Sequence, residues 1–282
     1  MMALLRSTRL QAVISGLLLT AAFPKPGLSV LAWIALVPLL IALRGLSIGA
    51  AFRAGMIAGL AHYLTLLYWV VLTMRVYGYL PWWQCISLLV LLAAYLALYP
   101  GLFAMALVRF GKRPIALILL GPIAWVALEY ARSFLLTGFP WGIVGYSQFN
   151  RLHIIQVSDM FGVYGVSFLV VFGNMACGLL LLAAGRHLWQ GRPVKRGGAA
   201  LATVSFLVLL GLTWSYGGKR VEAVAGSMAG AGTTRVAVIQ GNIDQARKWD
   251  PAFQIGATQK YVRLRRAATA HQPDLVVWPE TA

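Results

Sequence analysis

Glu280 is the residue whose type and position best fit a chemical role. A short apolar run, Leu275 to Trp278, leads to it through Pro279. A carboxylate at the carboxyl end of a parallel strand faces the crevice where α/β folds bind ligands. Because Pro279 keeps the preceding residue extended and ends strand pairing, it presents Glu280 at the rim of the sheet. A carboxylate fixed there can act as a general base. The alternative is a solvated loop glutamate.

Glu129 and Arg132 are ionisable residues inside an apolar segment. Their i, i+3 spacing places them on the same face of a helix. Charged groups at membrane depth are costly and usually face a partner or a cavity. Two interpretations stay open: a structural polar pair in which the two residues form an ion pair with each other, or a polar anchor that supports the loop at 137–149.

Trp249, in the sequence Lys248-Trp249-Asp250, is a candidate for substrate binding. An amphipathic indole in a loop above a sheet can contact lipid or the floor of an active site. Packing between the domain and the membrane is the alternative. The four histidines have no metal-ligand spacing, and no glycine-rich phosphate motif is present. We therefore expect no metal site and no cofactor.

The composition excludes an ordinary soluble domain. Hydrophobic residues make up 60% of the chain, charged residues 11%, and the mean hydropathy is +0.77. Soluble domains carry about 25% charged residues. The net charge of +17 does not indicate nucleic acid, because the basic residues lie between apolar blocks and form no single patch. Cys85 and Cys177 lie inside apolar blocks and are expected to be buried small residues.

Seven apolar segments are predicted to cross a membrane, together forming a multi-pass α-helical bundle over residues 1–218. A crossing needs about 20 apolar residues. The segments are 10–23, 27–43, 54–74, 84–108, 114–136, 160–184 and 199–217. The first is short, and two alternatives stay open for it: a cleavable signal peptide, or a re-entrant hairpin formed with the second.

The distribution of Lys and Arg predicts the orientation of the bundle. With the amino terminus in the cytoplasm, most of the loop cations face the cytoplasm, in agreement with the positive-inside rule. These are Arg44, Arg53, Arg109, Lys112, Arg113, Arg186, Arg192, Lys195 and Arg196, against Lys25, Arg75 and Arg151 on the other side. The segment after Tyr216 then lies in the periplasm of a Gram-negative cell.

A second unit is predicted after the bundle. Residues 219–234 have the Gly-, Ala- and Ser-rich composition of a linker. Residues 235–240 form a β-rich run, 251–271 have helical spacing, and 275–278 form a second apolar strand. A strand, a helix and a strand in this length predict a βαβ unit with parallel strands. Residues 235–282 are therefore interpreted as the amino-terminal fragment of an α/β domain.

These motifs together resemble a known family. RVAVIQGNI at 235–243, KWD at 248–250 and VVWPE at 276–280 resemble the opening of a nitrilase-superfamily domain, an αββα sandwich. After a multi-pass bundle, they resemble the apolipoprotein N-acyltransferase family. The bundle carries matching sequences of its own: EYAR at 129–132, TGFPWG at 137–142, GYSQ at 145–148 and GVYGVSF at 162–168.

The resemblance implies an acyltransferase with a Glu-Lys-Cys triad. Glu280 would be the general base toward the cysteine thiol, Trp249 corresponds to a functionally important tryptophan, and the lysine would stabilise the oxyanion. The implied partners are membrane lipid, a phospholipid acyl donor and the diacylglyceryl-cysteine of a lipoprotein. The implied location is the bacterial inner membrane, with the catalytic domain on the periplasmic side and the protein monomeric.

The lysine, the cysteine and a last membrane helix are expected beyond Ala282, so the chain alone is expected to be inactive. Two alternatives are kept. A membrane-anchored carbon–nitrogen hydrolase (amidase) of the same superfamily would use water as the acceptor. A non-enzymatic transporter would line a path at mid-membrane depth with charged residues.

Overall fold

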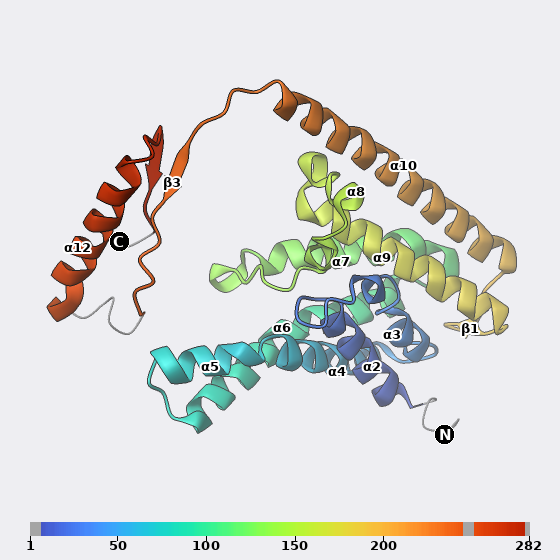
Figure 1. The fold of residues 1–282 in the computed structure, drawn as a ribbon. Helices are drawn as coiled ribbons and strands as arrows, with labels where there is room; N and C mark the ends of the chain where they lie inside the picture. The colour runs from blue at the N-terminus through green and yellow to red at the C-terminus, as the bar shows by residue number, and fades with distance from the viewer. Residues whose placement is uncertain (1–6, 245–250, 280–282) are drawn as a thin grey trace.

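The computed structural model describes residues 7–244 and 251–279, and it is mostly helical (Figure 1). The α-helices are α2 (Thr8–Ala21), α3 (Val37–Ala42), α4 (Ile48–Leu66), α5 (Tyr68–Tyr77), α6 (Trp82–Phe110), α7 (Leu117–Arg132), α8 (Leu152–Ile155), α9 (Ser158–Ala184), α10 (Arg196–Ala229) and α12 (Pro251–Thr269). Short 3-10 helices are η1 (Ser29–Trp33), η2 (Pro114–Ala116), η3 (Leu135–Thr137) and η4 (Val144–Gln148). The strands are β1 (Leu188–Trp189), β2 (Arg192–Pro193), β3 (Val236–Val238) and β4 (Leu275–Val277).

The expectation of seven crossing segments is corrected by these helices. Among the described residues, four helices are long and apolar enough to span a membrane: α6, α7 with η2, α9 and α10. The pair α4 and α5 makes a fifth if it counts as one span, bent by 45° at Leu67. The first two expected segments form shorter apolar stretches: α2 over 8–21, and η1 followed by α3 over 29–42.

The segment 27–43 does not form one helix because Pro38 lies in its middle. Proline has no backbone N–H and is best tolerated in the first turn of a helix, which is where Pro38 lies in α3. The irregular backbone before α3 is buried in protein and bonded to a side chain. Asn174, fully buried on α9, accepts from the Leu36 N–H at 2.8 Å and donates to the Ala32 carbonyl at 2.7 Å. Non-helical backbone at membrane depth requires such partners.

Small residues let α4 and α6 pack closely. A Cβ on Gly55 would lie 2.8 Å from both Ala104 Cβ and Gly101 Cα. Close approach through small residues is the common way in which membrane helices associate. The larger core draws residues from α2, α3, α4, α6, α7 and α9, with Leu36, Phe103 and Val170 buried inside it, and α9 packs mainly against α7 and α10.

A short antiparallel hairpin, β1–β2, links α9 to α10 and was not predicted. Its turn has Gln190 and Gly191 at positive φ, the geometry of tight hairpins. Trp189 is fully buried and donates its indole N–H to the Gly111 carbonyl at 2.7 Å. Gln190 Nε2 donates to the Leu43 carbonyl at 3.0 Å. The hairpin is therefore bonded to the loop after α3 and to the loop after α6, at one end of the bundle.

Helix α10 is longer than its predicted apolar core. It continues to Ala229, so most of the predicted linker 219–234 is helical rather than extended. Figure 1 shows α10 running from the hairpin past the bundle toward the small βαβ unit. The composition suggested a linker because of its glycines, but Ala is the best helix former and exposed glycines are tolerated at a cost of about 1 kcal/mol each.

The predicted strand–helix–strand order after residue 234 is confirmed. Strands β3 and β4 pair in parallel, with Val236 opposite Leu275 and Val238 opposite Val277. The helix α12 connects them. In Figure 1 this unit stands apart from the bundle.

Candidate functional site

Glu129 is buried at the end of α7 and binds the loop that follows. Its Oε1 accepts a hydrogen bond from the Val144 backbone N–H at 2.7 Å. The side chain is 4% exposed. The loop carries 3-10 turn η4 at this point, whose first N–H groups have no helical partner of their own. Glu129 therefore supplies an acceptor that the irregular loop lacks.

Arg132 binds the same loop at a second point. Its Nη1 donates to the Trp141 carbonyl at 2.8 Å, and its guanidinium carbon lies 5.5 Å from the centre of the Tyr63 ring on α4. The side chain is 1% exposed. A cation over an aromatic face is stabilised most strongly when both are removed from water.

The two residues do not form an ion pair with each other, although both are described. The ion pair found in the described part of the chain joins Arg220 to Asp159. Glu129 Oε2 and Arg132 Nη2 have no hydrogen-bond partner, and they border a void of about 10 Å³ beside Tyr63, Tyr99 and Trp125. Buried polar groups are rarely left unpaired, and a space of this size fits one water molecule.

Further contacts fix the loop that Glu129 and Arg132 hold. The Gly145 N–H donates to Ser167 Oγ on α9 at 3.0 Å, and Gln148 Nε2 donates to the Ser29 carbonyl at 2.9 Å. The loop turns sharply where Leu136, Thr137 and Gly138 all have positive φ. A non-glycine residue in that region is strained unless its surroundings hold it. Segment 135–149 is thus tied to η1, α7 and α9.

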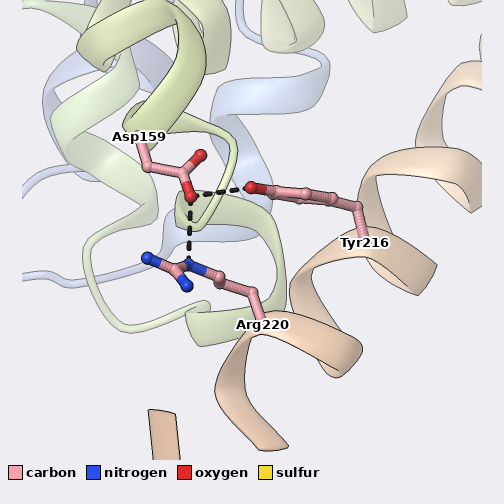
Figure 2. Close-up of polar contacts among 3 residues, drawn as sticks. All are labelled: Asp159, Tyr216 and Arg220. Carbon is pink, nitrogen blue, oxygen red and sulfur yellow. Dashed lines mark hydrogen bonds and ion pairs between the residues drawn. The ribbon is translucent and has the colours of Figure 1, made fainter. Parts of the chain in front are cut away.

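A polar cluster joins α9 and α10 near the same end of the bundle (Figure 2). Asp159 Oδ2 accepts a hydrogen bond from the Tyr216 hydroxyl at 2.7 Å and pairs with Arg220 Nε at 3.1 Å. Asp159 lies in the first turn of α9, before the kink at Gly162. The cluster attaches the carboxyl-terminal half of α10 to α9.

An apolar cavity of about 460 Å³ lies beside this cluster, between α7, α9 and α10. Its lining includes Phe161, Phe168, Leu169 and Leu209, with the Tyr164 and Thr213 side chains as its polar members. Tyr164 donates its hydroxyl to Ser133 Oγ at 3.0 Å at the end of α7. The lining has the character of a site for a hydrocarbon chain.

The strand that leads toward Glu280 is held by aromatic packing. The Trp278 ring stacks on Tyr261 of α12, with centroids 5.6 Å apart. Tyr261 is 3% exposed and also lies against Gly241, where any Cβ would collide with it. The Ile239 N–H donates to the Val277 carbonyl at 2.9 Å. These contacts fix the end of β4, while Glu280 and Trp249 themselves lie outside the described residues.

Of the predicted site residues, the structure therefore brings together Glu129 and Arg132, through one shared loop. The sequence did not identify two further buried polar residues. His62 on α4 is bonded to Thr20 Oγ1 at 3.0 Å, and Ser167 on α9 accepts from the Gly145 N–H. In the sequence, such residues are recognisable only as polar side chains within apolar segments. This pattern does not indicate which backbone group each side chain binds.

Comparison with known proteins gives consistent matches. Residues 15–176 match the family described as apolipoprotein N-acyltransferase N-terminal domain. A relative named apolipoprotein N-acyltransferase from Geobacter metallireducens is 44% identical over 98% of this chain and 51% of its own length. Relatives of the same name from Methylococcus capsulatus and Gloeobacter violaceus are each 32% identical, over 97% of this chain and 51% and 50% of their own lengths. The chain spans about half the length of these curated relatives.

Proposed function

Because the chain belongs to the apolipoprotein N-acyltransferase family, we propose that it forms the membrane-embedded half of an enzyme that N-acylates lipoproteins. In this proposal the bundle lies in the bacterial inner membrane, and residues 235–282 begin a nitrilase-like catalytic domain on the periplasmic side. The observation that carries the proposal is the 44% identity over 98% of the chain, which includes both the bundle and the βαβ unit.

The proposed reaction has two steps. Glu280 takes the proton of a cysteine thiol, the thiolate attacks the ester carbonyl of a phospholipid, and the lysophospholipid leaves with its alcohol oxygen protonated. The enzyme then holds the acyl group as a thioester. The free amino group of a diacylglyceryl-cysteine attacks that thioester, forms the amide and returns the thiol. A cysteine nucleophile requires such a base, and the cysteine and a lysine beside the oxyanion belong to the part of the enzyme after Ala282.

The bundle gives this chemistry a physical setting. Both proposed substrates keep their hydrocarbon tails in the bilayer, and moving a tail into water costs about 0.8 kcal/mol for each CH₂. A catalytic domain joined to the outer ends of membrane helices meets the reacting groups without extracting the tails. The apolar cavity between α7, α9 and α10 supports this proposal, since it lies at the end of the bundle from which α10 leads to the βαβ unit.

The proposal is tested by completing the enzyme. A chimera would continue residues 1–282 with the remaining half of the Geobacter metallireducens relative, and would be assayed in detergent with a phospholipid and a diacylglyceryl lipopeptide. We expect an amide-linked third acyl chain on the lipopeptide, measured by mass spectrometry. The 282-residue chain alone is the control and is expected to give none. Release of free fatty acid without lipopeptide acylation would favour the hydrolase alternative instead.

A further inference from the structure

A pocket of about 440 Å³ opens at the end of the bundle opposite Asp159. It lies between η2, strand β2 and the first turn of α10. Its floor is apolar, formed by the buried side chains of Leu179, Val194 and Ala199. Its rim carries three exposed cations, Arg113, Arg192 and Lys195. The pocket thus combines a hydrocarbon floor with a positive rim.

Within residues 7–244 and 251–279, none of these three cations forms an ion pair. The chain holds seven acidic residues, and none of them lies in the loops 43–53, 109–116 or 185–198. Glu129 and Asp159 act at the other end of the helices, and the remaining five follow residue 221 in the sequence. Among the described residues, the ion pair that occurs uses Arg220. The described residues around the pocket therefore leave the positive charge of the rim unbalanced, and an anionic ligand would balance it.

Hydrogen bonds to neighbouring loops hold the backbone around the pocket in place. The hairpin that carries Arg192 is fixed by the buried Trp189, which donates to the Gly111 carbonyl two residues before Arg113. Gln190 attaches the same hairpin to Leu43. Since the backbone positions on both sides of the pocket are held in this way, binding does not require the loops to be ordered first.

The position of the pocket along the membrane-spanning helices indicates the kind of ligand. Four candidate spans begin or end beside it: α6 ends at Phe110, the span of α7 begins at Pro114, α9 ends at Ala184 and α10 begins at Arg196. In a bilayer this is the level of the lipid headgroups. Basic pockets between membrane helices on the cytoplasmic side suit anionic headgroups, and guanidinium and ammonium groups bind phosphate through charge-assisted hydrogen bonds.

We propose that this pocket binds one anionic phospholipid, with its phosphate among Arg113, Arg192 and Lys195 and the start of its acyl chains along Leu179 and Val194. The site is distinct from the proposed catalytic end, so its lipid is not the acyl donor. The lipid bound there contacts the residues just before α7, the start of α10 and the last turns of α9.

The test is titration of the purified 282-residue chain with phosphatidylglycerol or phosphatidylcholine of equal chain length, followed by native mass spectrometry. The variant Arg113→Gln/Arg192→Gln/Lys195→Gln is compared with Arg9→Gln/Arg53→Gln/Arg109→Gln, which removes three exposed cations outside the pocket. Circular dichroism confirms that both variants keep their helices. We expect one phosphatidylglycerol to bind tightly, and the pocket variant to bind it at least about tenfold more weakly, since each basic residue contributes on the order of a fivefold attraction.

Three outcomes would overturn the proposal: equal losses in the two triple variants, equal binding of the two lipids by the unmodified chain, or displacement of the lipid by glycerol 3-phosphate at the same concentration. The last outcome would assign the site to a free phosphate. Activity of the chimera does not enter these readouts, so failure here leaves the proposed acyl transfer intact.

Discussion

Glu129 and Arg132 hold one loop at two backbone positions while making no ion pair with each other. Glu129 accepts from the Val144 N–H, and Arg132 donates to the Trp141 carbonyl three residues earlier. A buried charge is tolerated when hydrogen bonds replace its water. The two side chains therefore connect α7 to segment 135–149.

Glu129→Ala is expected to loosen the loop and destabilise the bundle by about 2 kcal/mol, the range for a lost hydrogen bond to a charged group. The substitution removes the acceptor of the Val144 N–H and leaves that N–H without its partner. Glu129→Gln is the matched control because it keeps an acceptor oxygen, and it should lose less. Hydrogen exchange at 143–145 and thermal unfolding in detergent measure the effect. Equal losses in the two variants would rule out the anchoring role.

Asp159→Ala is expected to release the second half of α10 with little change in overall stability. Arg220 and Asp159 are 48% and 35% exposed, and pairs of this kind contribute up to about 1 kcal/mol. The expected result is faster amide exchange over 216–229 and a change in melting temperature of a few degrees at most. Glu222→Gln, an exposed acid on the same helix, serves as the control. If exchange over 216–229 is the same in both variants, the cluster in Figure 2 does not fix α10.

Gly55→Ala is expected to force α4 and α6 apart. The added methyl group would approach Ala104 and Gly101 at 2.8 Å and the Pro100 carbonyl oxygen more closely still. Overpacking of this kind costs about 1–3 kcal/mol. Gly49→Ala, on the same helix with open space around it, should be neutral or stabilising because Ala favours helix over Gly. The thermal midpoints of the two variants in detergent check this prediction, which fails if they fall together.

Much of the bundle could be predicted because its signals are local. Segments such as 84–108 and 160–184 are apolar over a full membrane thickness, and α6 and α9 occupy them. The parallel pairing of β3 and β4 follows from the order strand, helix, strand. In each case, neighbouring residues along the chain carry the information.

The rest depends on contacts between distant parts of the chain. Segment 27–43 breaks at residues 34–36, just before Pro38, and Asn174, 138 residues from Leu36, binds the irregular backbone there. The hairpin at 188–193 exists because Trp189 finds a buried site beside Gly111. Glu129 and Arg132 could be identified as costly, yet their partners on the loop could not. Glu280 and Trp249 lie outside the described residues, so their roles stay predictions.

A reporter fused after Ala282 is expected to lie outside the cytoplasm. Many of the basic residues lie at the end of the bundle that holds the pocket of Arg113, Arg192 and Lys195, and the positive-inside rule assigns that end to the cytoplasm. Helix α10 begins at that end with Arg196 and leads away from it. Alkaline phosphatase fused at Ala282 should therefore be active, and green fluorescent protein there dark. The reverse pattern would invert the proposed topology and move the basic pocket to the outer leaflet.

Glu280→Gln in the chimera is expected to stop formation of the acyl-enzyme while leaving the fold intact. A glutamine cannot accept the thiol proton at neutral pH, so the cysteine stays a weak nucleophile. General-base catalysis contributes roughly a hundredfold to ten-thousandfold, and the rate of acyl labelling by a phospholipid should fall within that range. Glu222→Gln, at an exposed glutamate on α10, provides the control and should label normally. If labelling by Glu280→Gln proceeds at the unmodified rate with an unchanged melting temperature, the base is another residue and β4 has only a structural role.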